Sequence, residues 1–226
     1  MRRDGRVGVI GGTFDPIHCG HLAVARESQR ALRLDRITLI PSRHPPHRPE
    51  QPGAGRYHRF AMAVLAASDQ TSWDVSDAEL ERPGPSYTFD TLVAIANDGY
   101  EPSQIFFLLG SDAFAEIATW SRYPSVLDLA HFVVVSRSGT GLSSLKARVP
   151  ELAGRMIAPG DLDASPSTRV ILLEAVTPDV SSTEIRTHVR SNRSIDGLVP
   201  GSVARYIATQ HLYRMSSQDP SSVAGR

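Results

Sequence analysis

Short runs of consecutive apolar residues alternate along the chain with segments in which apolar positions recur every three or four residues. Five runs rich in β-branched or aromatic residues are typical of strands that are buried on both faces of a parallel sheet: 7–10, 37–40, 105–109, 132–135 and 170–173. The intervening segments with helical periodicity are 21–32, 59–67, 88–96 and 125–129. This alternation of strands and helices predicts an α/β fold, a doubly wound parallel sheet in a single domain.

Three segments interrupt the alternation. Residues 41–55 contain five prolines and two glycines, which predicts a loop after the second strand. Residues 139–168 are polar and contain three prolines, and we expect one short helix there within a surface insertion. The last residues, 216–226, are rich in serine and are typical of a flexible tail, so residues 1–215 are expected to form the domain.

The charge of the chain is balanced, with 24 Lys and Arg residues against 24 Asp and Glu residues. A nucleic-acid groove or a polybasic membrane surface needs a basic excess, so neither nucleic acid nor a membrane is an expected partner. Hydrophobic residues make up 41% of the 226 and charged residues 21%, as in ordinary soluble proteins. Cys19 is the only cysteine and no apolar stretch fits a signal peptide or a membrane span, so the expected location is cytoplasmic. The sequence leaves the oligomeric state open.

The first candidate site follows the first predicted strand, in the string Gly11-Gly12-Thr13-Phe14-Asp15-Pro16-Ile17-His18-Cys19-Gly20-His21. In doubly wound sheets, ligands bind outside the carboxyl ends of the strands, beside helix N-termini that attract anions. Gly11 and Gly12 allow a phosphate to approach the backbone closely. His18 and His21 are three residues apart where a helix is expected to begin, so both imidazoles should lie on one face. The string therefore predicts a site for a phosphate-bearing ligand.

Other interpretations of this string are open. A Gly-Gly pair after a strand often marks only a tight turn. Two histidines with Cys19 could hold a metal, although a structural zinc site needs four ligands and the chain has no second cysteine. The spacing departs from the Gly-x-Gly-x-x-Gly fingerprint, which disfavours a nicotinamide-dependent Rossmann enzyme.

The second candidate site is the string Val180-Ser181-Ser182-Thr183-Glu184-Ile185-Arg186. Ser181 and Glu184 have the spacing of a capping box, so we expect a helix to begin here. The simplest interpretation is a capped helix and nothing more. However, Ser182, Thr183 and Arg186 add hydroxyls and a guanidinium to a helix N-terminus that already favours anions.

Together the two strings resemble the nucleotidyltransferase superfamily, with its His-x-Gly-His and Ser-Ser-Thr-x-x-Arg motifs. The fold that this resemblance implies is Rossmann-like. It also implies that His18, His21 and Arg186 are catalytic and stabilise the phosphates of ATP as pyrophosphate departs. The ATP- and phosphate-binding residues that it implies are Gly11, Gly12, Thr13, Phe14, Ser182, Thr183 and Arg137.

Four further segments resemble bacterial nicotinate mononucleotide adenylyltransferases: Pro45-Pro46-His47-Arg48, the string from Pro85 to Leu92, Gly110-Ser111-Asp112 and Trp120. The mononucleotide-binding residues that the resemblance implies are His47, Arg48, Tyr87, Thr88, Asp112 and Trp120. Asp112 would accept hydrogen bonds from ribose hydroxyls, and Trp120 would stack on the pyridinium ring with cation–π attraction. Each segment alone fits a simpler structural role: an exposed turn at 45–48, a helix N-cap at Ser86 or Thr88, and a core position for Trp120.

The implied reaction is adenylyl transfer from ATP to nicotinate mononucleotide, which gives deamido-NAD and pyrophosphate in NAD biosynthesis. ATP and the mononucleotide are the expected partners, and Mg²⁺ is the expected cofactor, bound through ATP phosphates rather than protein side chains. Three alternatives stay open. They are an enzyme for the amide mononucleotide or for both mononucleotides, a phosphopantetheine adenylyltransferase, and a catalytically inactive nucleotide-binding module.

Overall fold

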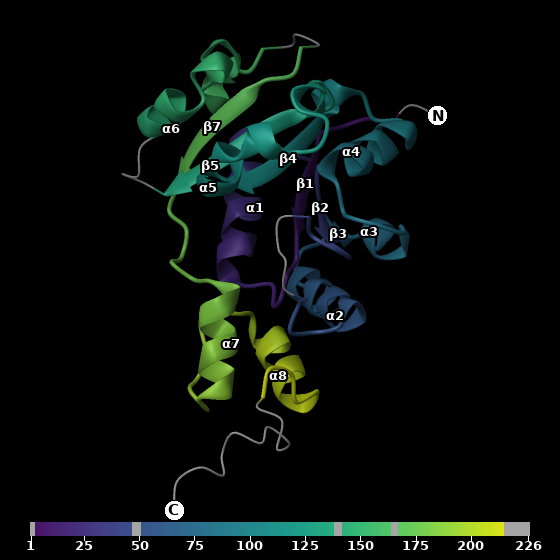
Figure 1. Ribbon diagram of the computed structural model, residues 1–226, viewed down its shortest axis with the longest axis vertical. Helices are drawn as coiled ribbons and strands as arrows, with labels where there is room; N and C mark the ends of the chain where they lie inside the picture. Colours follow the sequence, from purple (N-terminus) through teal and green to yellow (C-terminus); the bar gives the residue numbers. More distant parts are fainter. Residues whose placement is uncertain (1–2, 47–50, 138–141, 164–166, 215–226) are drawn as a thin grey trace, which may run out of the picture.

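A seven-stranded, all-parallel sheet forms the centre of the protein (Figure 1). The computed structural model describes residues 3–46, 51–137, 142–163 and 167–214. The strand order is β3-β2-β1-β4-β5-β7-β6. The strands are β1 (Val7–Gly12), β2 (Arg36–Pro41), β3 (Trp73–Val75), β4 (Ile105–Gly110), β5 (His131–Arg137), β6 (Met156–Ile157) and β7 (Val170–Ala175).

Helices connect the strands and cover both faces of the sheet. The α-helices are α1 (Cys19–Leu32), α2 (Arg56–Ala67), α3 (Ala78–Glu81), α4 (Thr88–Asn97), α5 (Ser111–Ala115), α6 (Leu142–Arg148), α7 (Ser182–Arg190) and α8 (Gly201–Thr209). Short 3₁₀ helices are η1 (Pro102–Gln104), η2 (Ile117–Thr119), η3 (Ser125–Asp128), η4 (Pro150–Arg155) and η5 (Pro159–Asp161). Figure 1 shows α7 and α8 together at the end of the molecule opposite to the N-terminus.

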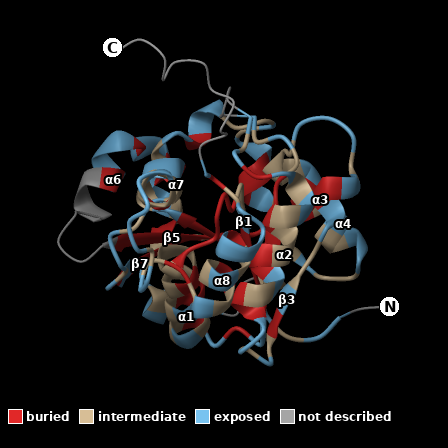
Figure 2. Cartoon of the chain, turned by 90° about the horizontal axis from the view of Figure 1, so that it is seen from below, coloured by how far each residue is buried: buried red, intermediate tan, exposed pale blue. Residues whose placement is uncertain are grey.

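Two apolar cores lie on opposite faces of the sheet because side chains of a strand alternate between its faces. In β5, Val133 and Val135 belong to a core with residues of α1, α2, α7 and α8. Phe132 and Val134 belong to the other core, with residues of α4, α5, α6 and the 3₁₀ helices η2 to η4. Figure 2 shows the buried residues along the strands and on the helix faces that are turned toward them. Helices on both faces confirm the predicted doubly wound architecture.

The strand order reverses between β1 and β4. The chain builds β1, β2 and β3 toward one edge of the sheet and then returns to place β4 on the other side of β1. At such a switch point the loops after the two central strands diverge and leave a crevice at their carboxyl ends. The crevice here lies after Gly12 of β1 and Gly110 of β4.

All five predicted strands are confirmed, whereas β3 and β6 escape the sequence pattern because they are only three and two residues long. The predicted helices at 21–32, 59–67 and 88–96 are α1, α2 and α4, and the one at 125–129 is the 3₁₀ helix η3. The segment 139–168 contains α6, but also the edge strand β6, so it extends the sheet rather than only decorating the surface. The predicted tail at 216–226 lies outside the described residues. None of the helices in the described part of the chain has the length and apolar character needed to cross a bilayer.

A buried histidine at the start of β5 makes the fold sensitive to acid. The His131 ring is 2% exposed and stacks on Phe106, and its Nδ1 accepts a hydrogen bond from the Arg169 backbone N–H at 3.0 Å. Burial is the main cause that lowers the pKa of His131 to about 4. Between that value and the ordinary pKa near 6.5, the unfolded chain binds the proton more readily than the folded chain, so stability falls as the pH falls.

We therefore expect the free energy of unfolding to decrease by about 2 kcal/mol per buried histidine between about pH 6.5 and about pH 5. His131→Asn keeps an acceptor for the Arg169 amide but cannot be protonated, so it should remove the share of this pH dependence that His131 contributes. Urea titrations monitored by circular dichroism at several pH values measure the effect. His211→Asn, at an exposed position, is the matched control and should keep the wild-type pH dependence. An unchanged pH dependence in His131→Asn would contradict the assignment.

Candidate active site

His18 and His21 lie against each other where α1 begins. Their ring centroids are 3.7 Å apart and the stacked rings are inclined by 29°, so both lie on one face as the three-residue spacing predicts. His21 Nδ1 accepts a hydrogen bond from the His18 backbone N–H at 3.3 Å, so in the neutral His21 ring the proton is on Nε2. Burial lowers the pKa of His18 to about 4, and this ring is therefore uncharged at neutral pH. Among the described residues, His18 Nδ1 has no hydrogen-bond partner.

The turn before the histidines is packed closely. Phe14 is 1% exposed, has a positive φ of 50°, and meets the His21 ring edge-on at a centroid distance of 5.1 Å. A Cβ at Gly12 would come within 2.9 Å of the Phe14 ring, so only glycine fits beside it. Arg59 of α2 is 1% exposed and donates a hydrogen bond to the Thr13 carbonyl oxygen in this turn. Gly12 therefore serves the packing of this turn, whereas a side chain at Gly11 would make only ordinary contacts.

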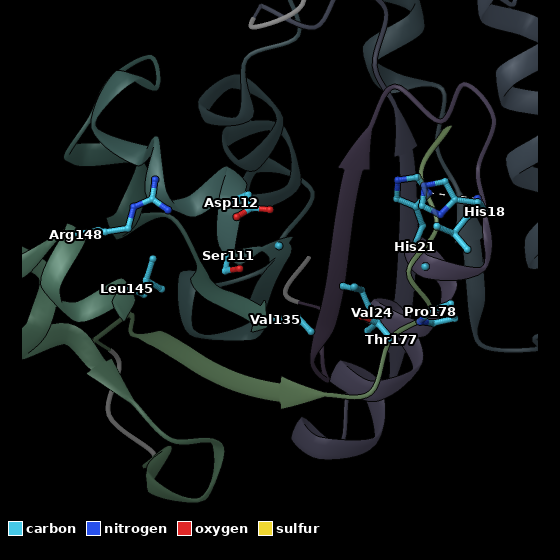
Figure 3. Close-up of a pocket in the computed structure, with 13 residues that line it drawn as sticks. His18, His21, Val24, Ser111, Asp112, Val135, Leu145, Arg148, Thr177 and Pro178 are labelled. Atoms are coloured by element: carbon cyan, nitrogen blue, oxygen red, sulfur yellow. Dashed lines mark hydrogen bonds between the residues drawn. The ribbon is translucent and has the colours of Figure 1, made fainter. Parts of the chain in front are cut away.

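Two adjoining pockets open at the switch point of the sheet. The first has a volume of about 440 Å³ and is shown in Figure 3. It is lined by α1, the start of α5, the end of α6 and the loop before α7, through residues such as His18, Asp112, Arg148 and Pro178. The second has a volume of about 390 Å³. Both pockets are lined by His21, Val24 and Gly110, so a ligand in one pocket can touch a ligand in the other.

The second pocket combines an aromatic wall with a helix N-terminus. Trp120 is half-buried and meets Phe107 edge-on at 6.0 Å, while its remaining surface lines the pocket. Thr88, the first residue of α4, lines the same pocket. Tyr87 and Trp120 also line a smaller hollow beside it. An aromatic side chain and a helix N-terminus on one lining suit a flat ring that carries an anionic group.

A buried carboxylate lies on the lining of the second pocket. Glu79 is 6% exposed and accepts a hydrogen bond from the Thr91 hydroxyl at 2.6 Å, and Arg82 donates to that hydroxyl at 2.9 Å. Burial raises the pKa of Glu79, whereas hydrogen bonds from Thr91 and Ser86 oppose the increase. This group holds α3 and α4 together.

Ser86 does not cap α4, although its place just before the helix would allow it. The N-cap of α4 is Tyr87, without a side-chain hydrogen bond. The Ser86 hydroxyl instead accepts the backbone N–H of Arg43 at 2.9 Å. The loop after β2 is therefore attached to the wall of the second pocket.

The second motif forms the start of α7, as predicted. Ser181 is the N-cap, and its hydroxyl accepts the Glu184 backbone N–H at 3.1 Å. Ser182 lines the second pocket and donates to the Pro16 carbonyl oxygen at 3.0 Å. The Arg186 guanidinium donates to the Asp15 carbonyl oxygen at 2.8 Å, and it lies 3.6 Å from the Asp15 carboxylate. The two motifs, which are far apart in the sequence, are therefore in direct contact.

Asp15 is the centre of this contact. Its carboxylate is 3% exposed and accepts hydrogen bonds from the backbone N–H groups of Gly53 at 2.7 Å and Ala54 at 3.0 Å. The Tyr213 hydroxyl donates to it at 2.8 Å. Burial, followed by the charge of Asp15, raises the pKa of Tyr213 strongly, so the phenol stays protonated and remains a donor.

The structure places most of the predicted site residues at the two pockets. The first pocket brings together His18, His21 and Asp112. The second brings together Gly11, Gly12, Thr13, Phe14, His21, Thr88, Trp120 and Ser182. Asp112 thus lies with the histidines rather than with Trp120, and its predicted contact with the mononucleotide stays a prediction. Five of the predicted ATP- and phosphate-binding residues lie instead in the same pocket as Trp120, on the side of the shared residue His21, and their roles also stay predictions: Gly11, Gly12, Thr13, Phe14 and Ser182.

Arg186 and Thr183 are on the lining of neither pocket, since Arg186 binds Asp15 and donates to the Thr183 hydroxyl at 3.2 Å. Arg137 ends β5, paired with Ala175 of β7, at the edge where the pockets open. His47 and Arg48 lie outside the described residues. Within the described ranges, no three side chains of His, Cys, Asp or Glu gather closely enough to hold a metal ion.

Several residues of the site were not singled out from the sequence. They are Asp15, Arg59, Glu79, Arg148 and Tyr213. Asp15 lies inside the first motif, so its position in the sequence could have marked it as a candidate. The other four are distant from both motifs in the sequence, and no local pattern marks them.

Removing the Tyr213 hydroxyl tests the importance of the Asp15 contacts. Tyr213→Phe keeps the ring but leaves a buried carboxylate with one hydrogen bond fewer, so we expect a loss of about 1–2 kcal/mol in the free energy of unfolding. Urea denaturation measures it. Tyr206→Phe is the matched control, because its hydroxyl contacts the half-buried His58 at 3.0 Å away from the pockets. If both variants lost the same free energy of unfolding, the hydrogen bond from Tyr213 to Asp15 would contribute no more to stability than an ordinary one.

Comparison with known proteins agrees with this geometry. A family model described as cytidylyltransferase-like matches residues 9–188. A probable nicotinate-nucleotide adenylyltransferase of Roseiflexus sp. (strain RS-1) is 41% identical over 208 residues, which cover 92% of this chain and 98% of the relative. A protein of the same description from Moorella thermoacetica is 36% identical over 216 residues, with coverage of 95% and 94%.

Solved structures share the fold. The nicotinic acid mononucleotide adenylyltransferase of Plasmodium falciparum, in complex with NaAD, superposes with a TM-score of 0.69 over 93% of this chain and 98% of that one. Its sequence is 18% identical, so this likeness concerns the fold alone. The family model and the two relatives extend over most of the chain, and the protein belongs to the cytidylyltransferase-like family and, within it, to the nicotinate-nucleotide adenylyltransferases.

Proposed function

We propose that this protein transfers the adenylyl group of ATP to nicotinate mononucleotide, with the first pocket for ATP and the second for the mononucleotide. The observation that carries the proposal is the position of His21, on the shared wall of two adjoining pockets at the switch point of the sheet. Two ligands that meet at this wall can react directly with each other. The volumes, about 440 and 390 Å³, are each of the size of a nucleotide site.

The chemistry follows from this juxtaposition. A 5′-phosphate oxygen of the mononucleotide attacks the α-phosphorus of ATP, the new P–O bond forms, and the bond from that phosphorus to the bridging oxygen of the β-phosphate breaks. The products are deamido-NAD and pyrophosphate. Transfer at phosphorus needs positioning and charge stabilisation rather than a protein nucleophile.

In this proposal, the histidine pair donates hydrogen bonds to the phosphates. His21 has its Nδ1 occupied by a backbone amide and therefore presents Nε2–H. His18 is neutral, so it can donate from one ring nitrogen without first gaining a proton. Gly12 and Ser182 would complete the phosphate-binding wall. Arg186, which donates a hydrogen bond to the Asp15 carbonyl oxygen, would hold the first motif in position for catalysis.

Mg²⁺ is part of the proposal as the counter-ion of ATP. Asp112 is the carboxylate on the lining of the first pocket. Mg²⁺ prefers oxygen ligands and commonly keeps several waters beside one or two carboxylates and substrate phosphates. This site therefore fits an ion that is bound mainly through ATP, where it would neutralise phosphate charge. The expected location in the cell is the cytoplasm.

The second pocket favours the acid form of the mononucleotide. The pyridinium ring would stack on Trp120, and its carboxylate would lie at the N-terminus of α4, near Thr88. The positive end of a helix dipole stabilises a carboxylate more than a neutral amide. A phosphopantetheine substrate has no aromatic ring or carboxylate that would use these two features of the pocket.

An assay of pyrophosphate release tests the function. With ATP and Mg²⁺, we expect turnover with nicotinate mononucleotide and a clearly lower kcat/KM with the amide at equal concentration. His21→Ala should lower kcat by about 10²–10³-fold, since it removes a donor to the transferring phosphates. His58→Ala, a histidine away from both pockets, is the control and should keep most of the turnover. No pyrophosphate release from the wild-type protein with either mononucleotide would refute the proposal.

Substitution of Trp120 tests the second pocket separately. Trp120→Leu should raise the KM for nicotinate mononucleotide about five- to tenfold through loss of cation–π stacking, with little change in the KM for ATP. Trp120→Phe keeps an aromatic face and should restore most of the affinity. Steady-state kinetics with one substrate varied at a time measure both constants. A rise in the KM for ATP alone would contradict the placement of Trp120 at the mononucleotide.

A further inference from the structure

The described residues that line the two pockets carry little positive charge. Among the described lining residues of both pockets, the charged side chains are Asp112, Glu79 and Arg148. Two of these are acids. Arg148 is thus the one lining side chain, in the described part of the chain, that is positively charged at every physiological pH.

The histidines do not supply this charge by themselves. His18 is uncharged at neutral pH because burial lowers its pKa to about 4. Its ring stacks on that of His21, so a charge on either ring would face the other at close range. A nucleoside triphosphate carries several negative charges, and a pocket of neutral donors leaves part of that charge uncompensated.

Arg148 lines the first pocket, and its neighbours anchor the end of α6 to the core. It is the last residue of α6, and Leu145 and Val149 beside it are 3% and 4% exposed within the core on that face of the sheet. Figure 3 shows Arg148 and Leu145 on the side of the pocket opposite to the histidine pair, with Ser111 and Asp112 between them. A ligand that extends across the pocket therefore meets the histidines on one side and Arg148 on the other.

The present partner of Arg148 competes weakly. The nearest carboxylate oxygen, Oε1 of Glu116, is 3.8 Å from the guanidinium, and the two side chains are 55% and 66% exposed. Exposed ion pairs of this kind contribute little because water screens them. Phosphate oxygens accept shorter, charge-assisted and bidentate hydrogen bonds from an arginine, so a bound nucleotide can replace Glu116.

We propose that Arg148, from the segment that extends the sheet, is an ATP-binding residue that contacts the triphosphate in the first pocket. This inference deepens the proposed function and rests on it. It gives the segment 139–168 a part in substrate binding, with α6 as the element that carries the cation.

Kinetics of Arg148 variants test the contact. Arg148→Ala should raise the KM for ATP about tenfold, with most of the effect on this constant and little on the KM for nicotinate mononucleotide. Arg148→Lys keeps the charge and should recover part of the loss. Lys146→Ala, on the same helix and exposed, is the matched control and should retain the wild-type KM for ATP. A KM for ATP in Arg148→Ala equal to that of Lys146→Ala would overturn the inference.

Calorimetric titration of ATP without the second substrate separates this inference from the proposed function. If wild-type protein binds ATP and Arg148→Ala binds it about tenfold more weakly, the inference holds even where the mononucleotide is not the acceptor. Equal affinities in the two proteins would overturn the inference while pyrophosphate release by the wild type upheld the function. Far-UV circular dichroism of Arg148→Ala and Lys146→Ala, compared with the wild type, checks that both variants are folded.

Discussion

The buried carboxylate of Asp15 joins four parts of the chain that lie far apart in the sequence. These are the turn after β1, the residues before α2, helix α7 and the segment after α8. An ionised carboxylate inside a protein is costly unless hydrogen bonds satisfy it, and three donors and a guanidinium do so here. The same contacts fix the first motif against the second. The position of the histidine pair relative to the start of α7 therefore depends on the contacts of Asp15, together with the hydrogen bond from Ser182 to the Pro16 carbonyl oxygen.

Among the described residues, the two pockets are lined mainly by neutral hydrogen-bonding groups rather than by cations. His18 is neutral because it is buried, and Arg186 is bound to Asp15 rather than placed on a pocket wall. Neutral donors with fixed positions can stabilise a charge that develops during a reaction without repelling one another beforehand. In the proposed function, full positive charge would come from Arg148, on the lining of the first pocket, and from a metal ion bound to ATP. This arrangement agrees with a chain whose acidic and basic residues balance.

Most of the fold could be predicted from the sequence because the central strands are continuous apolar runs. β1, β4 and β5 are buried on both faces, and an unbroken apolar run of this length is typical of a strand inside a parallel sheet. β3 and β6 could not be predicted, since two or three residues carry no period. The histidine pair was predictable because both members are local to one helical turn. The contacts of Ser86 and Tyr213 and the place of Arg148 on a pocket lining were not, since each depends on distant segments that only the folded chain brings together.

The wall shared by the two pockets, formed by His21, Val24 and Gly110, also bears on inhibition. A single molecule that fills both pockets loses its translational and rotational freedom once, whereas two separate ligands lose theirs twice. Joining an adenosine unit to a pyridine carboxylate through a linker of matched length therefore raises the effective concentration of each half at its own pocket. Because the pockets adjoin, the span between the halves is small, and a short and rigid linker is the favourable choice. With the substrates placed as proposed, the adjoining pockets thus define the shape of a tethered, two-pocket ligand.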